Sequence, residues 1–172
     1  LPQRAAVFAG SAEQAQCSLR SLSRGMADEH CVQSIAASEL GVVFVFPGFG
    51  CFPLDLTRSL YRQWPAFAAC LDEISAALAP FTHFSLRELL FADAAPEPDF
   101  FSRVDVRQPA MFAFSIALAR LWQSWGVAPA AVIGLSQGEI AAAFVAGALS
   151  LSDAAQVVAI RSSLLHRHLC TG

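Results

Sequence analysis

The chain has 172 residues, enough for one domain with a sizeable core or for a piece of a larger domain. Hydrophobic residues make up 55% of it, charged residues make up 15%, and the mean hydropathy is +0.50, whereas a typical soluble domain carries about 25% charged residues. This scarcity of charge favours a segment that buries part of its surface against other polypeptide. The net charge of −3 argues against a nucleic-acid-binding protein, which would need an excess of positive charge.

No apolar segment is long enough to cross a membrane. The longest apolar runs, at residues 111–121 and 140–149, fall short of the roughly 20 residues that a spanning helix needs. The chain opens at Leu1 without a signal-peptide pattern, and we expect it to have been cut from something longer. The five cysteines include no Cys-x-x-Cys pair, which indicates reduced thiols rather than disulfides or a metal site. We therefore expect a cytoplasmic protein.

The first elements are predicted from short apolar patterns. Residues 4–8 form a strand candidate, and residues 11–25 have apolar side chains at helical spacing. Residues 26–40 are mixed and polar, without a firm period. Residues 42–46 form an apolar run that Pro47-Gly48 ends, which predicts a buried strand that leads into a turn.

Helices dominate the middle of the chain. Residues 54–78 are predicted to form one or two helices, interrupted near Trp64-Pro65. Residues 80–105 are predicted to be irregular, with an exposed loop rich in Pro and acidic residues at positions 92–99. The clearest helix spans residues 109–125, where large apolar side chains lie on one stripe.

The last third contains a second strand and two helices. The strand is predicted at residues 127–134, and the helices at residues 137–146 and 153–168, with Ser152 as the N-cap of the last one. Strands that alternate with helices predict an α/β fold with a parallel sheet and flanking helices.

Ser136 lies in a Gly-x-Ser-x-Gly motif between the second strand and an Ala-rich helix. Such a turn holds a nucleophilic hydroxyl clear of the backbone, and its flanking glycines are needed because Cβ atoms would not fit. The pentapeptide alone is equally compatible with a serine that caps the helix. The Gly-flanked turn after the first strand, at residues 47–50, could supply a second backbone N–H to an oxyanion.

The motifs, taken in order, resemble the malonyl/acyl-CoA:acyl carrier protein transacylases, above all the acyltransferase domains of modular polyketide synthases. The likeness covers residues 41 to about 168, and residues 1–40 look like the end of the linker between ketosynthase and acyltransferase. The motifs that carry it are Phe-Pro-Gly-x-Gly at residues 46–50, Gln108-Pro109-Ala110 opening a long helix that ends in Leu-Trp, Trp-x-x-Trp-Gly-Val at residues 122–127, Gly-Leu-Ser-Gln-Gly-Glu-Ile-Ala-Ala-Ala at residues 134–143 and Val-Ala-Gly-Ala-Leu-Ser-Leu-Ser-Asp-Ala-Ala at residues 145–155.

The resemblance implies a role for five residues. Ser136 would attack an acyl-CoA thioester and hold the acyl group as an ester, with the backbone N–H groups of Gln137 and Phe49 as the oxyanion hole. Arg161 would pair with the free carboxylate of a malonyl-type unit, although by itself it also fits an ordinary surface arginine. Gln108 would line the site, or merely cap its helix. The acceptor would be the phosphopantetheine thiol of an acyl carrier protein, and no bound cofactor or metal is implied.

Three departures from the family pattern bear on activity. Leu135 stands where the family usually has His, and Phe49, Cys51 and Phe52 replace the polar residues of the first loop. The third departure is length, because the family's catalytic His lies downstream, beyond an inserted ferredoxin-like subdomain. The chain thus resembles the N-terminal part of the large, α/β-hydrolase-like subdomain, without the ferredoxin-like one, and we expect it to be inactive alone.

None of the four histidines is a strong substitute. His166 and His168 are predicted near the end of the last helix, where a positively charged side chain is ordinary, and His30 and His83 lie in segments without a motif. Cys51 has no neighbour in sequence that would lower its pKa. Two alternatives therefore stay open, a non-catalytic remnant or interaction fragment of a polyketide synthase, and a serine hydrolase that uses the same turn.

Overall fold

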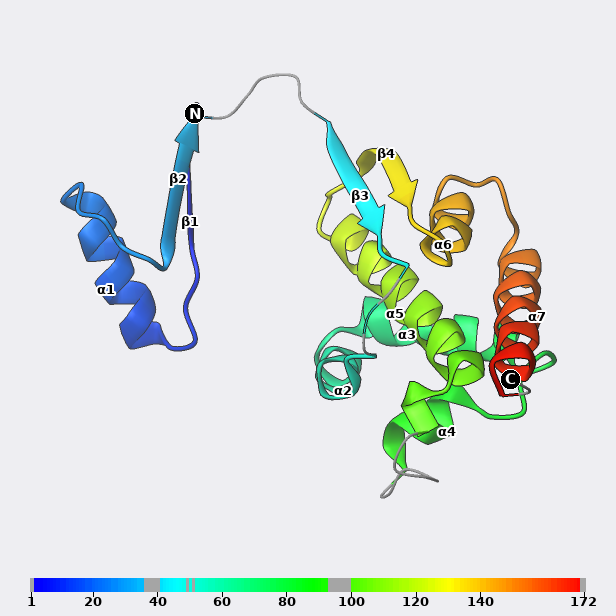
Figure 1. Cartoon of the computed structure of the whole chain (residues 1–172). Coiled ribbons are helices and arrows are strands. Elements are labelled where there is room, and N and C mark those ends of the chain that lie inside the picture. The colour runs from blue at the N-terminus through cyan, green and yellow to red at the C-terminus, as the bar shows by residue number, and fades with distance from the viewer. Residues whose placement is uncertain (1, 36–40, 49, 51, 93–99, 171–172) are drawn as a thin grey trace. The chain divides into compact units, whose positions relative to one another are not determined.

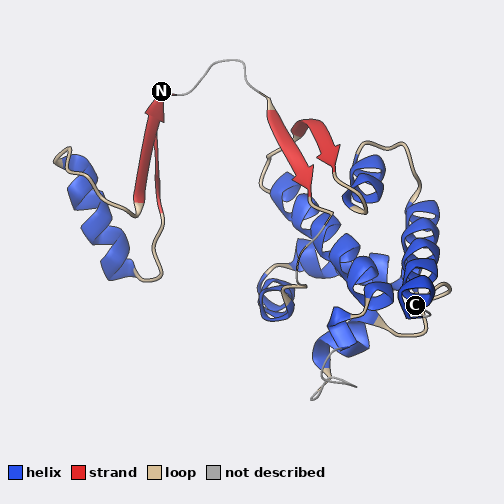
Figure 2. Cartoon of the chain, viewed as in Figure 1, coloured by secondary structure: helices blue, strands red, loops and turns tan. Residues whose placement is uncertain are grey.

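The computed structural model describes residues 2–35, 41–48, 50, 52–92 and 100–170, and shows two compact units, Leu1–Leu40 and Gly41–Gly172 (Figure 1). Helices predominate in the larger unit, as the colouring in Figure 2 makes plain. Within the described ranges no helix is long and apolar enough to cross a membrane.

The first unit is a two-stranded antiparallel sheet with one helix. Strand β1 (Gln3–Val7) pairs with β2 (Cys31–Ile35), and α1 (Ala12–Ser23) connects them. The Ser11 hydroxyl caps α1 by accepting a hydrogen bond from the backbone N–H of Gln14 at 3.2 Å.

Strand β2 corrects the expectation that residues 26–40 lack regular structure. Its five residues have no alternating pattern of their own, and four of them are exposed. The strand exists because β1 supplies a complete ladder of partners, from Gln3 opposite Ile35 to Val7 opposite Cys31. Such non-local pairing leaves little trace in the local sequence.

The second unit contains the predicted parallel sheet. Strands β3 (Val42–Phe46) and β4 (Pro129–Gly134) are hydrogen-bonded neighbours, with Phe46 opposite Gly134 at their carboxyl ends. Because parallel strands end at the same edge, the turns that follow β3 and β4 meet there. The α/β class with a parallel sheet and helices is therefore confirmed.

Six α-helices and one 3₁₀ turn occupy the rest of the described part of this unit. Apolar side chains of α3, α5, α6 and α7 form a continuous buried core, in which Phe67, Leu71 and Ile116 are fully enclosed. Helix α6 also contacts both strands. The elements are α2 (Leu54–Gln63), α3 (Pro65–Leu78), α4 (Leu86–Phe91), η1 (Phe100–Ser102), α5 (Val104–Ser124), α6 (Gly138–Val145) and α7 (Leu151–Cys170).

Helix α5 begins five residues earlier than predicted. It starts at Val104, so Pro109 lies inside the helix and the Gln108-Pro109 pair does not open it. A proline in the second turn removes one hydrogen bond, the one that its N–H would donate to the carbonyl of Asp105. Pro109 is fully buried, so apolar packing offsets this loss and the helix continues through it.

Two smaller expectations also change. Residues 80–105 are not wholly irregular, since Ser85 caps the short helix α4 by accepting from the N–H of Glu88 at 3.3 Å. Helix α7 begins at Leu151, and the capping hydroxyl is Ser150, not Ser152, because it accepts from the N–H of Asp153 at 3.1 Å. Most of the expected acidic loop, residues 93–99, lies outside the described residues.

Candidate active site

Ser136 lies on the turn that joins β4 to α6 and has a left-handed backbone conformation. Its φ is +54°, and among the described non-glycine residues no other has a positive φ. This conformation costs a residue with a Cβ atom about 1–2 kcal/mol, so the surrounding structure must impose it. The N-cap of α6 is Gln137 rather than Ser136. The geometry is therefore that of a nucleophile elbow and not of a helix cap.

The flanking glycines are required by close backbone contacts. A Cβ atom at Gly134 would collide with the backbone of Gly138 and Glu139, and one at Gly138 would collide with the carbonyl oxygen of Phe46. The motif thus closes against both its own helix and the neighbouring strand. This is the physical reason for the spacing Gly-x-Ser-x-Gly in this chain.

The turn after β3 packs directly against the elbow. The N–H of Leu135 donates to the carbonyl of Phe46 at 3.0 Å, which extends the parallel ladder past the end of β4. A Cβ atom at Gly48 would collide with the Leu135 carbonyl and the Ser136 side chain. The two turns therefore meet as their positions after parallel strands predict. Phe49, the expected second oxyanion donor, lies outside the described residues, as does Cys51.

Arg161 joins three elements at the serine. From α7, its guanidinium donates one hydrogen bond to Oε1 of Gln108 on α5 at 2.8 Å and another to Oγ of Ser136 at 3.2 Å. Arg161 and Gln108 are both half-buried, whereas Ser136 is exposed. Gln108 is the fifth residue of α5 and cannot be its cap. The structure thus brings together Ser136, Arg161 and Gln108, which lie far apart in the sequence.

Gln137 contributes both a backbone donor and a buried side chain. The N–H groups of Gly138 and Glu139 donate to the carbonyls of Leu135 and Ser136, but the N–H of Gln137 has no acceptor among the described residues. The residue is 6% exposed, and Oε1 has no hydrogen-bond partner in the described part of the chain. A backbone donor is therefore available beside Ser136, at the N-terminus of α6, where the helix dipole favours negative charge.

The histidines lie elsewhere. In the described ranges Ser136 makes no hydrogen bond to a histidine. His30 is in the first unit, 3.6 Å from Glu29. His166 is not simply a charge at the end of a helix, because its Nδ1 lies 3.6 Å from a carboxylate oxygen of Asp105, which His83 also approaches at 3.7 Å.

Asp105 is the polar residue that sequence reasoning missed. Its side chain is 8% exposed and accepts two hydrogen bonds from Arg103, at 2.8 and 3.2 Å. Burial alone would raise the pKa of this carboxyl group. The hydrogen bonds and charge of Arg103, together with His166 and His83, outweigh burial and hold that pKa below its usual value. The sequence offered one signal for Asp105, namely an acidic residue three positions before Gln108 and so on the same face of a helix.

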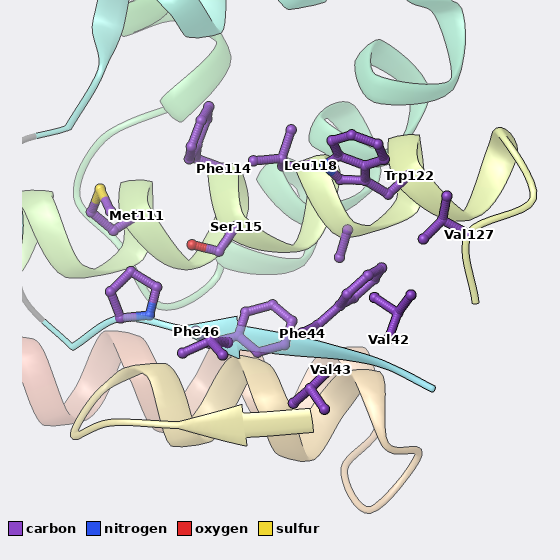
Figure 3. A pocket seen from close by; sticks show the side chains of 13 residues that line it. Val42, Val43, Phe44, Phe46, Met111, Phe114, Ser115, Leu118, Trp122 and Val127 are labelled. Atoms are coloured by element: carbon purple, nitrogen blue, oxygen red, sulfur yellow. The ribbon is translucent and has the colours of Figure 1, made fainter. Parts of the chain in front are cut away.

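A separate apolar groove of about 420 Å³ lies between β3 and α5. Figure 3 shows Phe44 and Val42 of β3 facing Leu118 and Trp122 of α5 across it. Ser136 does not line this groove. In the described residues, no group of three His, Cys, Asp or Glu side chains is placed to hold a metal ion.

The sequence matches a known family. The sequence model of the acyl transferase domain matches residues 43–172. The chain is 46% identical over 165 residues to erythronolide synthase EryA3 of Saccharopolyspora erythraea, which covers 96% of this chain and 5% of that protein. It is 45% identical over 162 residues to mycoketide-CoA synthase of Mycobacterium tuberculosis, covering 94% of this chain and 4% of that protein. The chain thus spans a small part of these relatives.

Solved structures give the same family. The acyltransferase domain from module 8 of the salinomycin polyketide synthase is 42% identical, with a TM-score of 0.82 over 97% of this chain and 39% of that one. The domain from the second module of the same synthase is 40% identical, with a TM-score of 0.80 over 96% and 38%. MCAT from Streptococcus pneumoniae is 35% identical, with a TM-score of 0.61 over 71% and 37%.

Each solved domain is therefore more than twice as long as the part that this chain matches. Three observations point to the same family: the elbow at Ser136, the parallel strands and the extended sequence identity. The chain belongs to the acyltransferase domain family of the modular polyketide synthases and spans part of such a domain.

Proposed function

We propose that this chain contributes the nucleophile and the acyl-binding arginine to a transacylase that moves a malonyl-type unit from CoA to an acyl carrier protein, in polyketide or fatty acid biosynthesis. The observation that carries the proposal is the contact between Arg161 and Ser136 on a strained elbow. CoA is a substrate here, and the phosphopantetheine group belongs to the carrier protein.

The reaction is a double displacement at Ser136. Oγ attacks the carbonyl carbon of the CoA thioester, its proton passes to a base, and the C–S bond breaks to release CoA as a thiol after protonation. The phosphopantetheine thiol then attacks the serine ester, which re-forms a thioester and frees Oγ. Since the described residues offer Ser136 no histidine, we propose that the base comes from polypeptide outside these 172 residues.

The negative charge that develops on the carbonyl oxygen would be stabilised by backbone donors. The unsatisfied N–H of Gln137 points to this role for the first donor. Phe49 is proposed as the second because it follows the turn that packs against Ser136 at Gly48. A backbone donor does not depend on its side chain, so the Phe at position 49 is compatible with it.

Arg161 would select acyl groups that end in a carboxylate. Its planar guanidinium can donate two parallel hydrogen bonds to a carboxylate, and a malonyl group places that carboxylate one methylene away from the reacting carbonyl. In the present structure one of those donors is 3.2 Å from Oγ of Ser136, and the other is bound by Gln108. Gln108 would therefore orient the guanidinium while the substrate replaces the contact with Oγ.

Further parts of the proposal concern the longer protein. We propose that residues 1–40 end a ketosynthase–acyltransferase linker and that residues 41–172 belong to the large, α/β-hydrolase-like subdomain. A ferredoxin-like subdomain, the catalytic His and the neighbouring synthase domains would then lie outside this sequence. A serine hydrolase is the weaker alternative, because Arg161 suits an acyl group that ends in a carboxylate rather than a plain ester. A cytoplasmic location is also part of the proposal.

The test is acylation measured by intact mass. The chain is incubated with malonyl-CoA or methylmalonyl-CoA, beside Ser136→Ala, first alone and then with the downstream half of a related domain. An adduct that needs both Ser136 and the added half supports the proposal, and an adduct on the chain alone shows that another base assists. No adduct in either case favours the non-catalytic remnant, with Leu135 and Phe49 as the first positions to restore.

A further inference from the structure

Three polar side chains gather around one buried carboxylate, that of Asp105, at the start of α5. Asp105 binds Arg103 through both carboxylate oxygens and has His83 and His166 within 3.7 Å. Arg103 also lies 3.4 Å from Nε2 of His83 and over the ring of Phe100. We refer to Asp105, Arg103, His83 and His166 as the Asp105 cluster.

The cluster connects segments that are distant in sequence. Asp105 belongs to the first turn of α5, His83 precedes α4, and His166 is on α7. The contact between Asp105 and His166 therefore links α5 to α7 near the N-terminal end of α5. The two helices also pack against each other through the apolar core.

The same two helices carry the residues that reach the serine. Gln108 lies one turn after Asp105 on α5, and three residues along a helix bring two side chains to the same face. Gln108 binds Arg161 of α7 at 2.8 Å, and Arg161 reaches Ser136 at 3.2 Å. Two polar links, Asp105–His166 and Gln108–Arg161, thus join the helices, three residues apart on α5 and five residues apart on α7.

The hydrophobic effect that packs α5 against α7 is non-directional. The buried residues of α5 include Ala110, Ala113 and Ala117, and those of α7 include Ala154 and Ala155. Methyl groups have no directional preference, whereas a buried carboxylate must keep its donors in place or lose solvation without compensation. The Asp105 cluster therefore supplies the directional constraint that these alanines lack.

We propose that Asp105 is a positioning residue, which holds α5 against α7 so that Gln108 and Arg161 stay aligned with Ser136. It does not touch Ser136, and its effect on acyl selection would pass through Arg161. This proposal rests on the proposed function only where it concerns acyl selection. The coupling between Asp105 and Arg161 is a property of the folded chain by itself.

The first test is a double-mutant cycle on the 172-residue chain, with Asp105→Asn, Arg161→Ala and both. Unfolding is measured by chemical denaturation. A non-additive effect of about threefold or more on the unfolding equilibrium constant supports coupling between two residues that do not touch. Additive effects would overturn the proposal, since a merely structural Asp105 would act independently of Arg161.

The matched control is Asp72→Asn in the same cycle. Asp72 is also a paired carboxylate, since it accepts a hydrogen bond from Tyr61 at 2.9 Å and lies 3.4 Å from Arg87, but it belongs to α3 and neither of these partners is hydrogen-bonded to Arg161 in the described part of the chain. Its combination with Arg161→Ala is expected to be additive. Coupling of equal size for Asp72 would count against a specific role for Asp105.

The second test uses the acylation assay with malonyl-CoA and acetyl-CoA in competition. Asp105→Asn is expected to lower the malonyl-to-acetyl loading ratio, and Asp105→Glu to restore part of it. A loss of both loadings in equal proportion would show a structural role only. If the unmodified protein takes up neither group, the proposed function fails, while the denaturation cycle still decides the role of Asp105.

Discussion

The turn around Ser136 and the apolar groove share strand β3, yet different forces hold them. At the turn, backbone atoms make the contacts: Gly48 lies against Ser136, Gly138 lies against the Phe46 carbonyl, and Leu135 bonds to that carbonyl at 3.0 Å. The groove is lined by side chains that include Val42 and Trp122, both of which are 45% exposed.

The difference teaches which parts of the domain are locally determined. At the elbow, backbone contacts between two short strands and one helix leave no room for a Cβ atom at the flanking glycines. An apolar sheet face, by contrast, becomes stable only when another layer covers it. The two regions therefore differ in what holds them: backbone contacts at the elbow, and side-chain burial at the groove.

The largest expected effect comes from placing a Cβ atom in the elbow. Gly138→Ala should lower the free energy of unfolding by about 3 kcal/mol or more, because the new methyl group meets the backbone of Phe46, which cannot move aside. Chemical denaturation measures it. Gly147→Ala is the control: its Cβ would meet open space and only the φ of +77° is strained, at about 1–2 kcal/mol. Equal losses would contradict a backbone-determined elbow.

Removing the guanidinium tests the elbow's chemistry without changing its backbone. Arg161→Ala should reduce the preference for malonyl over acetyl loading by about 10- to 100-fold, since a charge-assisted hydrogen bond contributes about 1.5–3 kcal/mol. The loading ratio is measured by intact mass. Arg120→Ala, an exposed arginine of α5, serves as control and should leave the ratio unchanged. An unaltered ratio in Arg161→Ala would sink the assignment of Arg161.

Acid should weaken the Asp105 cluster. Because the pKa of Asp105 is lowered in the folded chain, folding favours its ionised form. That stabilisation is complete above the usual aspartate pKa of about 3.9 and is lost as the pH falls further. The free energy of unfolding should therefore differ between the unmodified chain and Asp105→Asn at pH 7, and the difference should shrink at pH 3. A difference that grows in acid would refute this account.

The smallest expected change in stability concerns the groove. Val42→Asp should alter the free energy of unfolding by no more than about 0.5 kcal/mol, because the side chain is already exposed. It should nevertheless reduce the fluorescence of a bound hydrophobic dye, which the unmodified chain is expected to bind. Leu164→Asp, on α7 and outside the groove, is the control. A chain that binds no dye would show that the groove is closed in solution.

Local sequence predicted the elbow well because the constraint there is local. Gly134, Ser136 and Gly138 lie within five residues, and the two glycine identities answer backbone requirements. The parallel pairing of β3 and β4 was also predictable, since both are apolar strands ended by glycine-containing turns. The break between α2 and α3 at Trp64 was predictable from the proline that follows.

Features that depend on distant partners were not predictable. Strand β2 needs β1, and the early start of α5 depends on the burial of Pro109, which nothing in its immediate neighbourhood reveals. The Asp105 cluster joins residues 83, 103, 105 and 166, so its members are visible in the sequence but their meeting is not. The second oxyanion donor, Phe49, stays a prediction.

The left-handed backbone at Ser136 has a consequence for how such a domain evolves. Glycine would adopt a φ of +54° without strain. The substitution Ser136→Gly should therefore leave the fold intact and raise the free energy of unfolding by up to about 1 kcal/mol. Drift in a protein retained only as scaffold would therefore tend to replace this serine. A serine at this position therefore costs stability relative to glycine, and under the proposed function the reactivity of its hydroxyl would account for that cost.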